Sequence, residues 1–199
     1  MISIIDYGAG NLQSVKNALD YLKVDSRITD NADDILKADR IILPGDGSFG
    51  YMMRNLQKKN LISPIKNFIK SGKPFLGICL GLQGLFEESE ESPGVKGLSV
   101  FKGKVAKFRK GKVPQIGWNK IKIIKKNTSQ RGVFFDSYMY FVNSYYVIPE
   151  DKSIVAATAD YFGNFASAIQ CKNITAMQFH PEKSGKFGLN ILRNWLKYY

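Results

Sequence analysis

Three short apolar runs stand in the first ninety residues, and each ends in a loop rich in Gly, Asp or Cys. The runs cover residues 1–7, 40–45 and 73–78, with helical patterns between them. The apolar residues that follow the first run recur at the spacing of one helical face: Leu12, Val15, Leu19 and Leu22. Strands that alternate with helices predict a parallel, doubly wound sheet, whose functional crevice lies at the carboxyl ends of its strands.

From about residue 94 onward, strand-forming residues dominate. The β-leaning segments cover residues 99–108, 118–124, 138–148, 153–159 and 166–176. We expect them to extend the same sheet as antiparallel or mixed strands. A final helix begins at about Ser184, a plausible N-cap, and its apolar stripe includes Phe187, Ile191 and Trp195. The prediction is a single α/β domain over residues 1–199, with a mixed, mostly parallel sheet flanked by helices in a flavodoxin-like arrangement.

The chain is strongly basic, with 29 Lys and Arg against 17 Asp and Glu and a formal charge of +12. Such a charge alone favours a nucleic-acid or membrane partner. The lysines are dispersed, however, and in the densest run Lys120, Lys122 and Lys125 alternate with isoleucines as on the wet face of a strand. We therefore expect solvated faces and neither a nucleic-acid nor a membrane partner, with attraction to an anionic substrate or partner as an alternative.

Two cysteines, Cys79 and Cys171, occur in unrelated contexts, and no charged segment followed by an apolar stretch opens the chain. This pattern predicts a reduced, cytoplasmic protein without a signal peptide or membrane span. Because His180 is the only histidine and no paired cysteine spacing is present, we expect no zinc site.

Cys79 stands in the sequence Gly77-Ile-Cys79-Leu-Gly81, between an apolar strand and a helical pattern over residues 80–86. Small flanking residues permit the strained strand-to-helix turn that exposes a nucleophile. The backbone N–H of Leu80 is then placed to stabilise an oxyanion. The alternative is a buried cysteine at a strand end. Cys171 lacks the glycine frame and is interpreted as structural.

His180 lies in Gln178-Phe-His180-Pro-Glu182 at the end of another apolar run, which Pro181 stops. A thiol needs a general base, and the base needs a third group to orient it. His180 and Glu182 fit these two roles beside Cys79. A lone histidine is more often a core or surface residue, but its pairing with the Cys79 motif favours the catalytic interpretation.

A second glycine-rich loop, at residues 44–50, follows the strand that ends near Leu43. The backbone N–H groups of Gly45, Asp46 and Gly47 are candidates for the other half of an oxyanion hole. A tight surface turn explains the same residues.

Together these motifs resemble the class I, or triad, glutamine amidotransferases. Six segments narrow the resemblance to the glutaminase subunits of imidazole glycerol phosphate synthase, across essentially the whole chain: residues 6–11, 44–50, 86–91, 113–119, 140–145 and 178–184. The family fold, a mixed sheet flanked by helices, agrees with the pattern above. The resemblance implies hydrolysis of glutamine to glutamate and ammonia through a thioester on Cys79, with His180 as base and Glu182 as its orienting acid, and no cofactor or metal.

The resemblance also implies where substrate and partner lie. Gln83, Glu91 and the backbone around Ser144 and Tyr145 would hold the glutamine. Ammonia would pass to a separate barrel-shaped synthase (cyclase) subunit, in a heterodimer that serves histidine biosynthesis. Three residues would lie towards that partner: Asn11, Trp118 and Lys183.

Three positions depart from the family pattern. Asp46 stands where valine is usual, and Gln115 and Asn143 stand where many members have histidine. The departures leave a diverged copy as an alternative, one that supplies ammonia for amidination of surface-polysaccharide sugars. An inactive scaffold and a Cys peptidase or esterase on a similar fold are the remaining alternatives.

Overall fold

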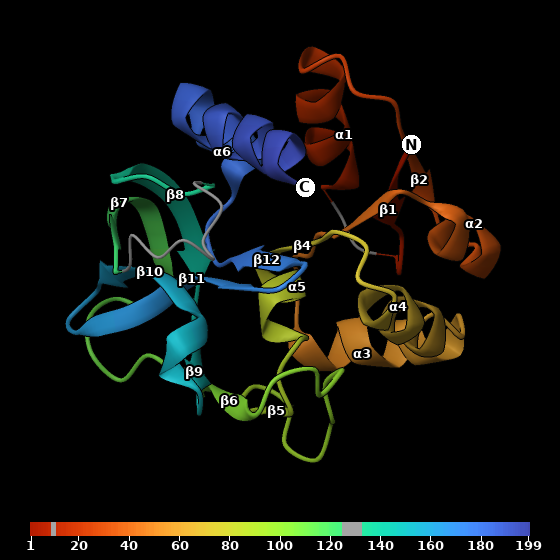
Figure 1. Ribbon diagram of the computed structural model, residues 1–199. Coiled ribbons are helices and arrows are strands. Elements are labelled where there is room, and N and C mark those ends of the chain that lie inside the picture. The colour runs from red at the N-terminus through yellow and green to blue at the C-terminus, as the bar shows by residue number, and fades with distance from the viewer. Residues whose placement is uncertain (9–10, 125–132) are drawn as a thin grey trace.

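The computed structural model describes residues 1–8, 11–124 and 133–199, and it contains one twelve-stranded sheet (Figure 1). The turn at residues 9–10 and the predicted strand position of Lys125 lie outside the described residues.

Five parallel strands form one half of the sheet. In spatial order they are β2 (Ser26–Thr29), β1 (Ile2–Ile5), β3 (Arg40–Leu43), β4 (Phe75–Ile78) and β12 (Ile174–Met177). Every residue of β1, β4 and β12 is buried, because helices cover both faces of this half. The carboxyl ends of β3, β4 and β12 are neighbours, as expected if the functional crevice lies at this edge of the sheet.

Antiparallel strands form the other half. From β12 the order continues through β11 (Asn164–Cys171), β10 (Val155–Asp160), β7 (Gln115–Ile123) and β8 (Ser137–Asn143). Three more strands join from the side: β9 (Tyr145–Pro149), β6 (Gly103–Lys107) and β5 (Glu88–Ser89). In β7 the exposed Lys120 and Lys122 flank the buried Ile121, as the alternation predicted. The expected mixed sheet is confirmed.

The helices cover the two faces as separate groups (Figure 1). On one face lie α1 (Leu12–Tyr21) and α6 (Gly185–Tyr198). On the other lie α2 (Ala32–Lys37), α3 (Phe49–Lys58), α4 (Ile62–Lys70) and the single turn α5 (Leu80–Gln83). Two short 3-10 turns, η1 (Lys152–Ile154) and η2 (Pro181–Lys183), complete the described elements. Each face has its own apolar core, one around Phe49 and Leu56, the other around Leu19 and Trp195.

Four predicted segments have different boundaries in the structure. Residues 138–148 form two strands, β8 and β9, with Ser144 between them. Residues 166–176 form the hairpin of β11 and β12, where Lys172 adopts the left-handed conformation (φ 52°) at the turn. Residues 99–108 start their strand only at Gly103, because Ser99 is also left-handed. The helix expected over residues 80–86 ends at Gln83.

The last helix begins as predicted, but Ser184 does not cap it with its side chain. The Ser184 hydroxyl instead donates to the His180 carbonyl at 2.6 Å and accepts from the Tyr140 N–H at 2.9 Å. It therefore ties the end of β12 to β8. Ile191 and Trp195 are buried as expected, whereas Phe187 is partly exposed at the first turn.

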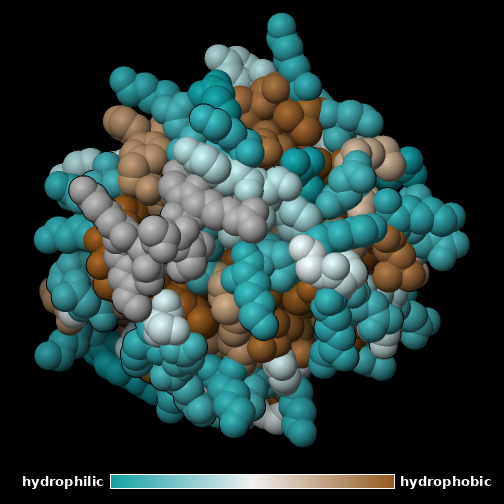
Figure 2. Space-filling view, viewed as in Figure 1, coloured by the Kyte–Doolittle hydropathy of each residue, from teal (hydrophilic) through white to brown (hydrophobic). Residues whose placement is uncertain are grey.

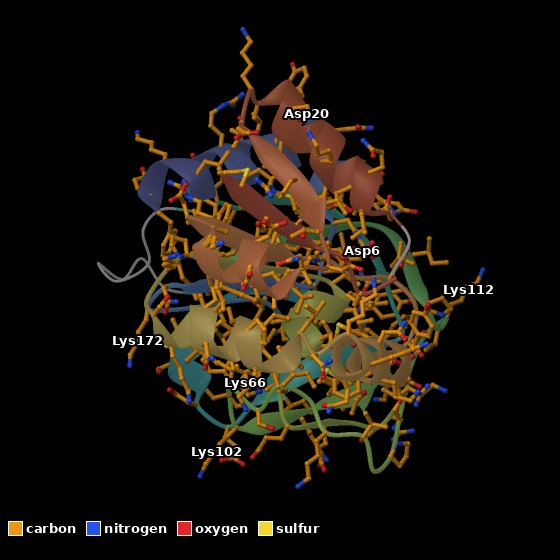
Figure 3. All side chains as sticks on the ribbon, turned by 90° about the vertical axis from the view of Figure 1, so that its right-hand side faces the viewer. Asp6, Asp20, Lys66, Lys102, Lys112 and Lys172 are labelled. Atoms are coloured by element: carbon orange, nitrogen blue, oxygen red, sulfur yellow. The ribbon has the colours of Figure 1, made fainter. Side chains whose placement is uncertain are left out.

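The surface view is dominated by hydrophilic side chains with small apolar patches between them (Figure 2). The labelled lysines Lys66, Lys102, Lys112 and Lys172 lie at separate places around the periphery (Figure 3). No helix within the described ranges is long and apolar enough to cross a membrane.

Candidate active site

Cys79 occupies a strained turn between β4 and α5. Its backbone has φ 53° and ψ −105°, a conformation that residues with a side chain rarely adopt. The turn needs close backbone approach, since a Cβ on Gly81 would lie 1.8 Å from the Leu43 carbonyl oxygen, and one on Gly77 would lie 2.8 Å from the Gly81 oxygen. The predicted nucleophile turn is therefore present, and its glycines fit it against β3.

His180 lies beside Cys79, although about 100 residues separate them in sequence. Both residues are buried and line the same cavity, and the two side chains are close enough for Cys79 to shift the pKa of His180. Burial alone disfavours an imidazolium, but the Cys79 thiolate and then the Glu182 carboxylate outweigh it and raise the pKa of His180 to about 10. A protonated imidazole beside a cysteine favours the thiolate, which is the reactive form of a cysteine nucleophile.

Glu182 holds the other side of the histidine ring. His180 Nδ1 lies 2.8 Å from Glu182 Oε1, and the Glu182 side chain is only 1% exposed. The His180 N–H also donates to the Tyr140 carbonyl at 2.9 Å, so that both the backbone and the ring of His180 are fixed. His180 therefore lies between Cys79 and Glu182 in the order expected for a catalytic triad.

Gln178 is a further neighbour of the thiol that the sequence interpretation missed. Its side-chain amide donates to Cys79 Sγ at 3.4 Å and accepts from Gln83 Nε2 at 3.0 Å. Alternation along a strand places residues i and i+2 on the same side, so the position of Gln178 two residues before His180 was the available signal.

The predicted oxyanion donors surround the same point from two loops. Asp46, Gly47 and Leu80 line one cavity together with Cys79. Within the residues that the structure describes, no other backbone group accepts from the N–H of Asp46, Gly47 or Leu80. Gly45 lies behind this lining, where a Cβ would meet Leu80 at 2.8 Å, so it supports the loop but does not face the cavity.

This cavity has a volume of about 380 Å³, a size suited to a small molecule such as an amino acid. The four residues expected to hold substrate all line it: Gln83, Glu91, Ser144 and Tyr145. The Gln83 amide nitrogen already donates to Tyr145 O and Gln178 Oε1, which leaves its carbonyl oxygen for a ligand. One Glu91 oxygen accepts from the Phe49 N–H at 2.6 Å, at the start of α3.

The three departures from the family pattern lie at or near the cavity. Asp46 lines it directly, and so does Asn143. Gln115 faces Asn143 across the β7–β8 ladder, and both side chains are buried. Two positions that are far apart in sequence therefore form one cross-strand pair.

Of the residues expected to face a partner, Asn11 and Lys183 lie beside the site. Trp118 is 56% exposed on β7, and Lys183 is exposed at η2. Asn11, half-buried before α1, donates to Glu182 Oε1 at 3.2 Å. It thus contacts the triad, a role that the motif comparison did not suggest.

A larger cavity, of about 800 Å³, lies at the opposite ends of β4 and β12 and includes Cys171. It holds none of the triad. Burial raises the pKa of the Cys171 thiol, which agrees with a structural cysteine. Among the described side chains there is no group of three or more His, Cys, Asp or Glu that could hold a metal ion.

Comparison with known proteins points to the same chemistry. The family model for the class-I glutamine amidotransferases matches residues 3–198. A relative from Methanocaldococcus jannaschii, named imidazole glycerol phosphate synthase subunit HisH, is 49% identical over 99% of both chains. A relative of the same name from Chlorobaculum tepidum is 43% identical over all of both chains.

Solved structures share the fold at lower identity. A crystal structure of a glutamine amidotransferase has a TM-score of 0.79 at 16% identity, over 99% of this chain and 97% of its own. PurLQS from Thermotoga maritima has a TM-score of 0.77 at 19% identity, with the same coverage. The chain belongs to the class-I glutamine amidotransferase family, in which its relatives at 43% to 49% identity carry the HisH name.

Proposed function

We propose that this protein hydrolyses glutamine to glutamate and ammonia as the glutaminase subunit of imidazole glycerol phosphate synthase. The observation that carries the proposal is that Cys79 and His180 line one cavity, with Glu182 bound to the other side of the His180 ring. The full-length similarity to relatives named as HisH subunits supports the same conclusion.

The reaction begins with the thiol proton on His180, as its raised pKa favours. The Cys79 thiolate attacks the amide carbon of glutamine, a sulfur–carbon bond forms, and the carbonyl oxygen takes the negative charge. We assign the stabilisation of this oxyanion to the N–H groups of Leu80, Asp46 and Gly47, because these three residues line the cavity beside Cys79. The carbon–nitrogen bond then breaks while His180 gives its proton to the leaving nitrogen, so ammonia departs and a thioester remains.

Hydrolysis of the thioester completes the cycle. His180 takes a proton from water, the hydroxide adds to the thioester carbon, and the thiolate of Cys79 leaves. Throughout both steps Glu182 keeps the ring oriented and stabilises its positive charge. Gln83, Glu91, Ser144 and Tyr145 hold the amino-acid part of the substrate by lining the cavity.

Ammonia from this site goes to a separate synthase subunit. The relatives are named as one subunit of a synthase, which implies a second chain. We assign the second chain to a barrel-shaped cyclase subunit that binds as a heterodimer. We assign the exposed Trp118 and Lys183 and the half-buried Asn11 to the contact face.

A diverged glutaminase that serves a sugar-amidating synthase is the second candidate. It is favoured by the carboxylate of Asp46 in the cavity lining and by the Gln115 and Asn143 pair, which replace residues usual in the histidine pathway. Both candidates share the same reaction and differ only in the partner.

Glutamate release tests the proposal. The purified chain is assayed alone, and then with the histidine-pathway synthase subunit of its own organism and the ribulosyl nucleotide substrate. We expect low release alone and strong stimulation in the mixture. Folded protein whose Cys79 reacts with a glutamine-directed electrophile, but which that partner does not stimulate, would identify the second candidate. Absence of any thioester or release would rule out both.

A further inference from the structure

Tyr7 lies two residues after the end of β1 and outside the cavity lining. Its side chain is fully buried, and its hydroxyl has no hydrogen-bond partner among the residues that the structure describes. Buried polar groups without a partner are rare and costly. A second arrangement of the surrounding residues that supplied an acceptor would therefore be stabilised by this hydroxyl.

The hydroxyl lies against the loop that carries the oxyanion donors. A Cβ on Gly45 would be 2.6 Å from the Tyr7 oxygen, which places this oxygen beside the Gly45 backbone. Burial, followed by the negative charges of Asp46 and Cys79, raises the pKa of Tyr7. Tyr7 therefore keeps its proton at neutral pH, and its hydroxyl is available as a hydrogen-bond donor.

The peptide bond between Gly45 and Asp46 is not held by hydrogen bonds within the described residues. Neither the carbonyl of Gly45 nor the N–H of Asp46 takes part in a hydrogen bond with any described residue. In a trans peptide the N–H and the C=O point in opposite directions. When the Asp46 N–H points into the cavity, the Gly45 carbonyl therefore points away from it, to the buried side where Tyr7 lies.

We propose that Tyr7 is a positioning residue: when the loop turns the Asp46 N–H towards the oxyanion, the Tyr7 hydroxyl, which is unpartnered among the described residues, donates to the Gly45 carbonyl and holds that arrangement. The inference rests on the proposed glutaminase function and adds a residue to its machinery. Tyr7 itself lies outside the cavity lining, so it acts through the peptide and not on the substrate.

The test compares Tyr7→Phe with wild type in the complex with the synthase subunit. We expect kcat for glutamate release to fall about tenfold, less than the loss of an oxyanion donor itself, with KM within about twofold. Alkylation of Cys79 by iodoacetamide forms no oxyanion, so its rate should stay at the wild-type value. The urea midpoint should not fall, because the variant removes an unpartnered hydroxyl.

Tyr161→Phe is the matched control, since the Tyr161 hydroxyl donates to the Lys112 carbonyl away from the cavity. It should leave kcat unchanged. If Tyr7→Phe lowers the urea midpoint, Tyr7→Met provides a second variant without the hydroxyl and should show the same selective loss. The role of Tyr7 would be overturned, and the proposed function left intact, if Tyr7→Phe left kcat of the active complex unchanged. An equal fall in the rate of Cys79 alkylation would have the same meaning. A wild-type complex without glutamate release would overturn the proposed function and this inference with it.

Discussion

Asn11 donates a hydrogen bond to Oε1 of Glu182, the same carboxylate oxygen that holds the His180 ring. The distance is 3.2 Å for Asn11 and 2.8 Å for His180. Asn11 has a left-handed backbone (φ 64°) immediately before α1, so its side chain turns back towards η2. Residues expected at the partner face thus reach the triad through one hydrogen bond, a direct route for coupling partner binding to catalysis.

Loss of this bond should weaken catalysis. For Asn11→Ala we expect kcat for glutamate release to fall about five- to tenfold, because a hydrogen bond to a charged group is removed beside His180. Gln13→Ala, at the start of the same helix but bonded only to Asn17, is the control and should have no effect. Steady-state kinetics of the complex measure both. Equal activity of the two variants would show that the hydrogen bond from Asn11 to Glu182 does not contribute to catalysis.

Cys79→Ala separates the two reactions of the complex. Glutamine-dependent synthesis should be lost, since no other described thiol lies in the cavity. Synthesis with added ammonium salt should remain near the wild-type rate, because free ammonia can enter the partner's site. Product formation with each nitrogen source is the measurement. Loss of both activities would contradict the division of labour between the subunits.

The raised pKa of His180 sets a pH dependence for the thiol. Below a pH of about 10 the imidazolium is retained and stabilises the thiolate, and above it this attraction disappears. The ratio of Cys79 alkylation rates, wild type over His180→Ala, should therefore be large near pH 7 and approach one by about pH 10. Peptide mass spectrometry after iodoacetamide treatment separates Cys79 from Cys171. A ratio near one at pH 7 would mean that His180 is not the partner of the thiol.

The close approach of Gly81 to β3 should dominate the stability of the nucleophile turn. A Cβ there would lie 1.8 Å from the Leu43 carbonyl oxygen, so Gly81→Ala should lower the free energy of unfolding by about 3 kcal/mol or more. Gly94→Ala is the control, because Gly94 has φ 83° but no atom within 4 Å of the added Cβ. It should cost about 1 kcal/mol through backbone strain alone. Urea unfolding distinguishes the two, and equal losses would remove the steric argument.

The sequence was most informative at residues such as glycine and proline, whose effect on the backbone depends little on their surroundings. Glycines around Cys79 and the proline after His180 allowed both strand ends to be predicted, and these ends meet in the structure. The hydroxyl of Ser184 was misjudged, since an N-cap and a bridge to the Tyr140 backbone use the same residue type. Such a choice depends on tertiary contacts, which no local pattern contains.

Long-range contacts explain the remaining omissions. Tyr7 is one apolar residue at the end of a strand, and only the approach of Gly45 shows that its hydroxyl has a use. Gln115 and Asn143 were noted as separate departures, yet β7 and β8 place them opposite each other. Pairing across a sheet is decided by register, which short β-leaning segments do not specify.

Asp46 provides the sharpest test of how this chain differs from its family. Asp46 lines the cavity beside Cys79, where negative charge develops on the substrate oxygen in the transition state. A second negative charge at that point is unfavourable, because like charges at close range repel each other. Replacement by a neutral residue should therefore raise kcat.

Two variants separate charge from shape. Asp46→Asn keeps the size of the side chain and removes its charge, while Asp46→Val restores the residue usual in the family. We expect both to raise glutamate release about three- to tenfold, with or without the synthase subunit, and to leave the alkylation rate of Cys79 nearly unchanged. An increase with valine alone would assign the effect to shape. No change with either variant would mean that the Asp46 carboxylate points away from the oxyanion. In that case only the backbone of Asp46 would line the cavity.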